Sequence, residues 1–188
     1  MAQISTGDIR PGMKIEMNNE PYIVVINDFV KPGKGQAFNR IKFKNIISGR
    51  VVEKTYKSGD KLTLADVEEK QMRLLYTEQD AAVFMDDNTF EQLTVPFSVI
   101  KENRKWLLDD TLYETVFYKG EIIDIIPPTF MEIKITKTDP GYRGDTASGR
   151  VMKPATVSTG AIIQVPIFVE EEETIKVDTR TGEYVSRV

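Results

Sequence analysis

Short runs of alternating apolar and polar residues cover most of the chain, and turn residues recur every 8–12 positions. In residues 38–45 the alternation puts Ile41 and Phe43 on one face of a strand and Arg40, Lys42 and Lys44 on the other. Similar runs occupy 14–17, 22–28 and 51–57. About five short strands in the first ~60 residues predict a small SH3-like barrel.

One stretch, 98–109, has the spacing of an amphipathic helix, and Trp106 lies on its apolar face. We therefore expect Trp106 in a core rather than on a base-stacking surface. Strands are predicted on both sides of this helix, which suits an OB-type barrel. They span 71–77, with Met72, Leu74 and Tyr76 on one face, then 81–85, 112–118 and 121–126.

Two segments are predicted to separate domains: the acidic stretch 62–70, read as a linker, and Pro127-Pro128, which suits no central strand. A third β-module follows, with strands near 131–136, 161–169, 174–178 and 183–188. The expected fold is all-β, with three small barrel domains at 1–64, 65–127 and 128–188.

The 188-residue chain contains no His and no Cys. Disulfides, the usual structural zinc sites, thiol nucleophiles and Ser-His-Asp machinery are therefore excluded. Enzymes can work through Asp, Glu, Lys or Tyr alone, but these absences favour a non-enzymatic protein. No apolar run approaches the roughly 18 residues of a membrane span, and no secretory signal is visible at the start. We expect a cytoplasmic protein without a metal.

Charge is unevenly distributed along the chain. The formal net charge is −4, yet residues 1–61 hold 11 Lys and Arg against 6 Asp and Glu. Most of the excess lies in 31–61, where nine cations face two acids. A basic end on an acidic body favours contact with a polyanion at that end, although a solvated strand face would give the same counts.

The most informative segment is a loop that carries Lys34 between Gly33 and Gly35, just after Pro32. The glycines allow a narrow loop from which the lysine side chain projects. An ordinary exposed lysine in a hairpin is the alternative. A P-loop is excluded because the GxxxxGK[ST] spacing is absent, and an exposed lysine lacks the desolvation of a Schiff-base lysine.

A second glycine-rich loop, 139–149, offers Tyr142 and Arg143 for contacts with bases or phosphates. A plain connection between strands is the alternative. The loop does not fit a calcium site, because Gly141 and Arg143 stand where ligands are needed. The acidic run 170–173 is predicted to be a solvated turn.

Residues 29–40, FVKPGKGQAFNR, resemble the modified-lysine loop of bacterial translation elongation factor P. The resemblance continues in order through TFEQL at 89–93, KWLLD at 105–109, TDPGYRGDTAS at 138–148, KPATVSTG at 153–160 and IKVDTRTGEYVSR at 175–187. One position departs from it: Glu172 stands where the family usually has glycine.

The resemblance implies an SH3-like (KOW-like) first domain and two OB-type domains in an L-shaped, tRNA-like arrangement. It also implies a monomeric, cytoplasmic factor that binds both ribosomal subunits beside peptidyl-tRNA and relieves stalling at consecutive prolines. The modified residue would be Lys34, supported by Pro32, Gly33 and Gly35. It would carry a lysyl-type extension added by a dedicated enzyme, with no other cofactor.

The predicted RNA contacts fall into two groups. The third-domain loop is implied to lie near exit-site mRNA, and Lys34 would act at the opposite end of the molecule. The RNA-binding candidates are Lys31, Arg40, Lys42, Lys44, Tyr142, Arg143, Gly144, Asp145 and Thr146.

Two other functions stay open: a general RNA-binding OB protein, and an enzyme that uses Lys34 with a carboxylate.

Overall fold

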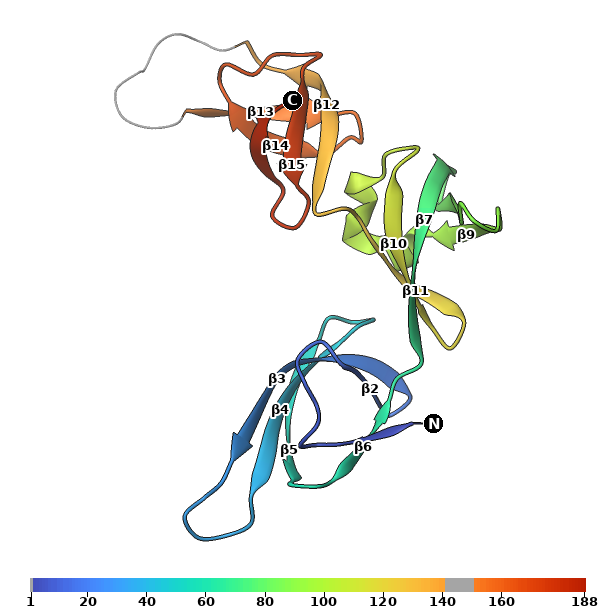
Figure 1. The fold of residues 1–188 in the computed structure, drawn as a ribbon. Coiled ribbons are helices and arrows are strands. Elements are labelled where there is room, and N and C mark those ends of the chain that lie inside the picture. The colour runs from blue at the N-terminus through green and yellow to red at the C-terminus, as the bar shows by residue number, and fades with distance from the viewer. Residues whose placement is uncertain (1, 141–150) are drawn as a thin grey trace. The chain divides into compact units, whose positions relative to one another are not determined.

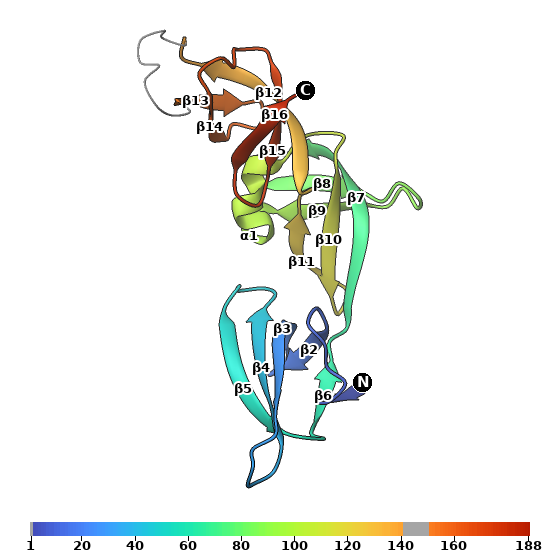
Figure 2. The ribbon, with the colours of Figure 1, turned by 60° about the vertical axis from the view of Figure 1, so that its left-hand side comes forward.

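The computed structural model describes residues 2–140 and 151–188. The described residues form three curled antiparallel sheets with little helix, which confirms the all-β prediction (Figures 1 and 2). Two compact units result, residues 1–70 with 115–124 and residues 71–114 with 125–188. In the part of the chain that the structure describes, no helix has the length and apolarity needed to cross a membrane.

The first sheet has six strands in the order β1-β6-β2-β3-β4-β5. As the alternation predicts, Ile41 and Phe43 are fully buried, and the Phe43 ring packs edge-on against Tyr22 and Tyr56. The sheet thus closes over one apolar core. Its strands are β1 (Gln3–Ser5), β2 (Lys14–Met17), β3 (Glu20–Val30), β4 (Phe38–Asn45), β5 (Val51–Lys57) and β6 (Lys61–Leu64).

The predicted linker at 62–70 is wrong. Residues 61–64 form β6, residues 67–77 form β7 (Val67–Thr77), and only Ala65 and Asp66 lie between them. The N-terminal part of β7 has four consecutive exposed residues, from Glu68 to Gln71, so neither of its faces shows an apolar pattern. Backbone pairing with the neighbouring strands of its sheet defines this strand instead. The Thr115 hydroxyl also donates to the Lys70 carbonyl at 2.8 Å.

The middle sheet has the order β11-β10-β7-β8-β9. Met72 and Leu74 of β7 are buried as predicted, but Tyr76 is 47% exposed. The register of β7 on β8 shifts between Leu74 and Tyr76, and such an irregularity moves the following side chains to the other face. The remaining strands are β8 (Ala81–Met85), β9 (Gln92–Pro96), β10 (Leu112–Tyr118) and β11 (Glu121–Ile126).

The predicted helix at 98–109 is shorter and less regular than its pattern indicates. A single α-turn, α1 (Phe97–Ile100), is followed by a 3-10 segment, η1 (Lys101–Trp106). Lys101 has a φ of 54°, which an α-helix cannot continue through. The Tyr113 hydroxyl donates to the Trp106 carbonyl at 2.7 Å and accepts from the Leu108 amide at 2.8 Å. The segment therefore ends at Trp106.

Trp106 is a core residue as predicted, being only 1% exposed, but the core is that of the third sheet. This sheet has the order β14-β13-β12-β15-β16. Alternate residues of its strands, such as Ile133 and Ile135, point into one cluster that includes Trp106. The strands are β12 (Phe130–Thr138), β13 (Met152–Val157), β14 (Ile162–Pro166), β15 (Thr174–Asp178) and β16 (Glu183–Arg187).

Glu172 lies in the turn before β15 and has a φ of 67°. This left-handed conformation costs most L-residues about 1–2 kcal/mol, whereas glycine adopts it freely. The Glu172 amide donates to the Ile135 carbonyl at 3.0 Å, which holds this turn to the third sheet. The Glu172 side chain also forms an exposed ion pair with Lys134, which is worth at most about 1 kcal/mol.

Glu172→Gly should therefore raise the melting temperature slightly, and Glu172→Ala should lower it. Both variants lose the ion pair, but only glycine relieves the backbone strain. Thermal unfolding followed by circular dichroism measures the difference between the two. An alanine variant that melts above the glycine variant would show that the backbone conformation is not the governing factor at this turn.

Candidate functional site

Lys34 lies at the end of the long hairpin formed by β3 and β4. The two strands pair from Tyr22 opposite Asn45 up to Val30 opposite Phe38, and residues 31–37 connect them. Figure 2 shows this loop extending past the ends of the neighbouring strands of the first sheet. Lys34 is exposed. Among residues 2–140 and 151–188, no ion pair engages its amine.

The two glycines beside Lys34 have different roles. Gly35 has a φ of 117°, which L side chains rarely adopt, and a Cβ there would lie 3.7 Å from Pro32 Cγ. Gly33 does not have a positive φ, and a Cβ there would meet no atom within 4 Å. Gly35 therefore sets the shape of the loop, and Gly33 leaves open space beside the lysine.

Gly35→Ala should accordingly distort the loop, and Gly33→Ala should leave it unchanged. Both variants should change the amide chemical shifts at and next to the substituted residue. Only the Gly35 variant should also move the shifts of the rest of residues 31–37, with the first-sheet core unaffected in both. The matched pair separates backbone conformation from side-chain bulk. Equal shift changes in the two variants would contradict the distinction.

Two asparagines, Asn39 buried and Asn27 half-buried, anchor the base of the hairpin. Asn39 of β4 is buried and its amide donates to Asn27 Oδ1 of β3 at 2.9 Å. The Asn27 amide in turn donates to the carbonyl oxygens of Thr6 at 3.0 Å and Ile9 at 2.9 Å. Breaking this chain would leave polar groups unpaired, which costs about 1–3 kcal/mol for each group that stays buried. The two hairpin strands are thereby fixed to the segment after β1.

The start of β4 is also tied to the turn between β5 and β6. The Ser58 amide donates to the Ala37 carbonyl at 3.0 Å, and the Thr6 amide donates to the Asp60 carbonyl at 2.8 Å. The buried Thr6 hydroxyl adds a bond to the Lys57 carbonyl at 3.2 Å. The loop therefore has a firmly held base and a solvent-exposed tip.

The outer face of β4 carries Arg40, Lys42 and Lys44, as the alternation predicts. Acidic side chains stand opposite two of them, Asp28 across from Arg40 and Glu53 across from Lys42. Arg40 Nε approaches Glu53 Oε1 at 3.8 Å. Lys44 is paired instead with Ile23 and Val51. This basic face thus keeps its net positive charge.

The other predicted site residues divide into two groups. Lys31 is exposed at the start of the Lys34 loop, next to the partly buried Pro32. The third-domain candidates Tyr142, Arg143, Gly144, Asp145 and Thr146 lie outside the described residues. Within the described part, no group of three or more acidic side chains is placed to hold a metal ion.

Sequence reasoning missed the anchors Thr6, Asn27 and Asn39. One signal was present: Asn39 occupies the same inward face of its strand as Ile41 and Phe43. A polar residue at an inward position requires a buried partner, so the pattern alone indicates that Asn39 is bonded to another element. The partner itself cannot be read from the pattern.

Comparison with known proteins places the chain in a family. Three family models match it in succession: the elongation factor P KOW-like domain at residues 5–62, the OB domain at 67–125 and the C-terminal domain at 131–187. The chain belongs to the elongation factor P family. The resemblance to elongation factor P that the sequence motifs indicate is therefore confirmed over nearly the whole chain.

Relatives of full length support this membership of the elongation factor P family. The chain is 61% identical to "Elongation factor P 2" of Protochlamydia amoebophila and 59% identical to "Elongation factor P 2" of Chlamydia muridarum. Both alignments cover 100% of this chain and 99% of the relative. Family membership, rather than any single side chain, assigns the protein to translation.

Solved structures resemble the fold. The eukaryotic translation initiation factor 5A from Methanococcus jannaschii aligns with a TM-score of 0.52 and 23% identity, covering 66% of this chain and 96% of that one. A translation initiation factor eif-5a family protein from Naegleria fowleri gives 0.55 and 14%, covering 66% and 95%. At these identities the likeness is one of fold.

Proposed function

We propose that the protein binds the ribosome beside peptidyl-tRNA and stimulates peptide-bond formation at consecutive prolines, with Lys34 reaching the peptidyl transferase centre. The observation that carries this proposal is the exposed Lys34 at the tip of a hairpin with an anchored base. Membership of the elongation factor P family supports a role in elongation. A narrow cationic tip suits a deep site lined by RNA.

The proposed action is positional. Prolyl nucleophiles react slowly, so the peptidyl-tRNA must be held in a reactive geometry for longer. A bound factor that restrains its CCA end would lower the entropic part of the barrier, while the ribosome supplies the chemistry. The hydrogen bonds of Asn27 and Asn39 support this action, because a tip on a loose base would restrain nothing.

Lys34 is proposed to carry a lysyl-type extension of its ε-amine. The exposed tip, with open space beside Gly33, is accessible to a modifying enzyme. Intact-mass spectrometry of the natively expressed protein should show an added mass that maps to the tryptic peptide containing residue 34. An unmodified mass, from a host whose modifying system is active on its own factor, would contradict the extension.

Contacts with RNA are proposed at the basic face of β4 and, in the third domain, at Gly144, Asp145 and Thr146 with Tyr142 and Arg143. The first group is supported by its placement on one exposed face. Cations on such a face neutralise phosphates and release counterions. The second group is supported by its sequence alone.

A general RNA-binding OB protein is the competing function. It would bind free single strands with a steep salt dependence and would not distinguish templates. An enzyme that used Lys34 would instead turn over a small substrate. The proposed factor should do neither.

Single-turnover peptide-bond formation on purified ribosomes distinguishes these functions. With a template that encodes consecutive prolines, the modified protein should raise the rate about tenfold or more, a change of at least ~1.4 kcal/mol in the barrier. With an alanine template the rate should not change. Equal stimulation on both templates, or stimulation only after preincubation with free RNA, would contradict the proposal.

A further inference from the structure

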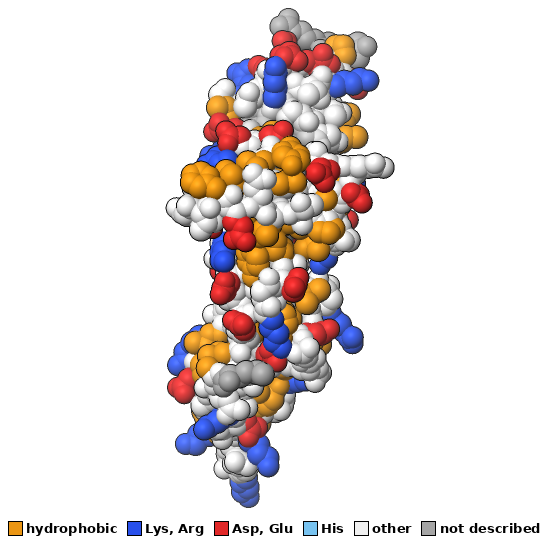
Figure 3. Space-filling model, turned by 90° about the vertical axis from the view of Figure 1, so that its right-hand side faces the viewer, with side chains coloured by type: hydrophobic (Ala, Val, Ile, Leu, Met, Phe, Trp, Pro, Cys, Tyr) orange, Lys and Arg blue, Asp and Glu red, His pale blue; other side chains and the backbone are white. Residues whose placement is uncertain are grey.

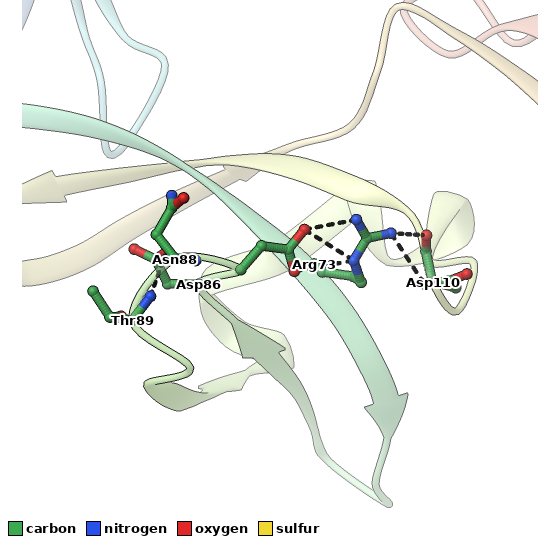
Figure 4. Close-up of polar contacts among 6 residues, drawn as sticks. Arg73, Asp86, Asn88, Thr89 and Asp110 are labelled. Carbon is green, nitrogen blue, oxygen red and sulfur yellow. Dashed lines mark hydrogen bonds and ion pairs between the residues drawn. The ribbon is translucent and has the colours of Figure 1, made fainter.

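The connection between β8 and β9 is a preorganised turn. The Phe90 amide donates to the Asp86 carbonyl at 2.8 Å, and the Asp86 amide donates to the Glu91 carbonyl at 3.0 Å. Asp86 Oδ1 accepts from the Asn88 amide at 2.8 Å and the Thr89 amide at 3.3 Å. These bonds close residues 86–91 into one conformation. Figure 4 shows the part of the turn formed by Asp86, Asn88 and Thr89.

Arg73 fixes this turn to a second loop (Figure 4). Its guanidinium bonds both carboxylate oxygens of Asp87, with Nη2 at 2.6 Å from Oδ2, and Nη1 donates to the Asp110 carbonyl at 2.9 Å and to Asp110 Oδ1 at 3.0 Å. The hydrogen bonds from Arg73 lower the pKa of Asp87. A bidentate pair of this kind restricts the orientation of both partners.

The turn holds Phe90 outside the core in an unfavourable conformation. Phe90 has a φ of 59° and is 71% exposed. Two other exposed phenylalanines are partly covered, since Lys176 lies over Phe130 and Arg187 over Phe168. Phe29 is also exposed, at 58%, but it has no positive φ. In the described residues no aromatic ring or cation lies over Phe90. Folding alone thus explains neither its ring nor its backbone, and strain of this type is typical of functional positions.

Acidic residues are concentrated in and beside the turn that holds Phe90. Asp86, Asp87 and Glu91 belong to the turn and Asp110 joins it through Arg73, so four carboxylates stand against one guanidinium. Figure 3 shows Asp and Glu side chains beside hydrophobic ones at several places on one face of the molecule, with Lys and Arg among them. A negative rim repels phosphate and attracts cations.

We propose that the β8–β9 turn, residues 86–91, is a docking element whose Phe90 ring enters an apolar pocket rimmed by Lys and Arg on a partner protein. An aromatic anchor with an electrostatically complementary rim is the usual composition of an interaction hot spot. We expect this partner protein to belong to the ribosome. The inference rests on the proposed function only in this choice of partner.

The test compares Phe90→Asn and Glu91→Lys with Phe168→Asn in the full-length protein, by sedimentation with purified ribosomes. Asparagine tolerates the left-handed conformation, so Phe90→Asn should keep or raise the melting temperature. It should weaken binding about tenfold, as the loss of an anchor does, while the Phe168 control binds normally. Glu91→Lys should also weaken binding if the partner is a basic protein and should strengthen it if the partner is RNA.

A benzophenone amino acid in place of Phe90 then identifies the contact. The expected product is a cross-link that survives ribonuclease and is destroyed by protease. A cross-link to RNA, tighter binding by Glu91→Lys, unchanged binding by Phe90→Asn, or a melting temperature that falls as for a core truncation would each overturn the inference. If the wild-type protein itself fails to sediment with ribosomes, the proposed function fails together with it, whereas the other outcomes leave that function standing.

Discussion

Lys34→Ala should abolish the stimulation of consecutive-proline synthesis and leave the fold intact. The side chain is exposed and, in the described part of the chain, forms no ion pair, so the free energy of unfolding should change by less than about 0.5 kcal/mol. Activity should fall at least tenfold, to the rate without the factor. The measurement is dipeptide or tripeptide formation on a proline template, with thermal melting in parallel.

Lys31→Ala is the matched control, since it removes an exposed lysine from the same loop. It should reduce activity far less, because we assign no action at the reaction centre to Lys31. Sedimentation with ribosomes should show that Lys34→Ala still binds, which separates action from occupancy. Full complementation by Lys34→Ala, in cells that lack the native factor, would refute the role of this lysine.

Reversing two charges on the basic face, Lys42→Glu with Lys44→Glu, should produce the second large effect. If each lysine neutralises a phosphate, the slope of log affinity against log salt should lessen by about 0.7–0.9 for each phosphate left without its lysine. Affinity for ribosomes at low salt should drop at least a hundredfold, because the variant repels the phosphates that the wild-type protein attracts. Titration at several salt concentrations measures both quantities.

The control reverses the same amount of charge elsewhere in the first sheet, with Lys54→Glu and Lys61→Glu. Lys54 pairs with the buried Ile41 and therefore lies on the opposite face from Lys42. This control should change the affinity for ribosomes only through its effect on the net charge of the protein. If both double variants have the same salt slope, the face of β4 is not the one that meets RNA.

The fold could be predicted wherever a strand has one buried face. Residues 38–45 meet this condition, and their bounds and orientation are confirmed. Prediction failed where the condition does not hold: the N-terminal part of β7 is exposed on both faces, the register shift near Tyr76 reverses the alternation, and the backbone at Lys101 interrupts the helical spacing. In each case a backbone feature overrides a side-chain pattern.

The site could be predicted only in part. Lys34 could be recognised because its glycine neighbours and the other residues of the motif at 29–40 are contiguous in sequence. The anchors could not be recognised in this way, since Thr6, Asn27 and Asn39 come from separate elements that meet only in the folded chain. Phe90 looks like an ordinary turn residue until its φ and exposure are known.

The position of Trp106 has a practical consequence for anyone who divides this protein. It is the chain's single tryptophan, and it belongs to η1 in sequence but to the third-sheet core in space. A fragment that starts at β12 would lack the largest side chain of its own core. The smallest piece able to fold as the third core therefore includes η1, and the fluorescence of this one indole reports the melting of a sheet to which it is not adjacent in sequence.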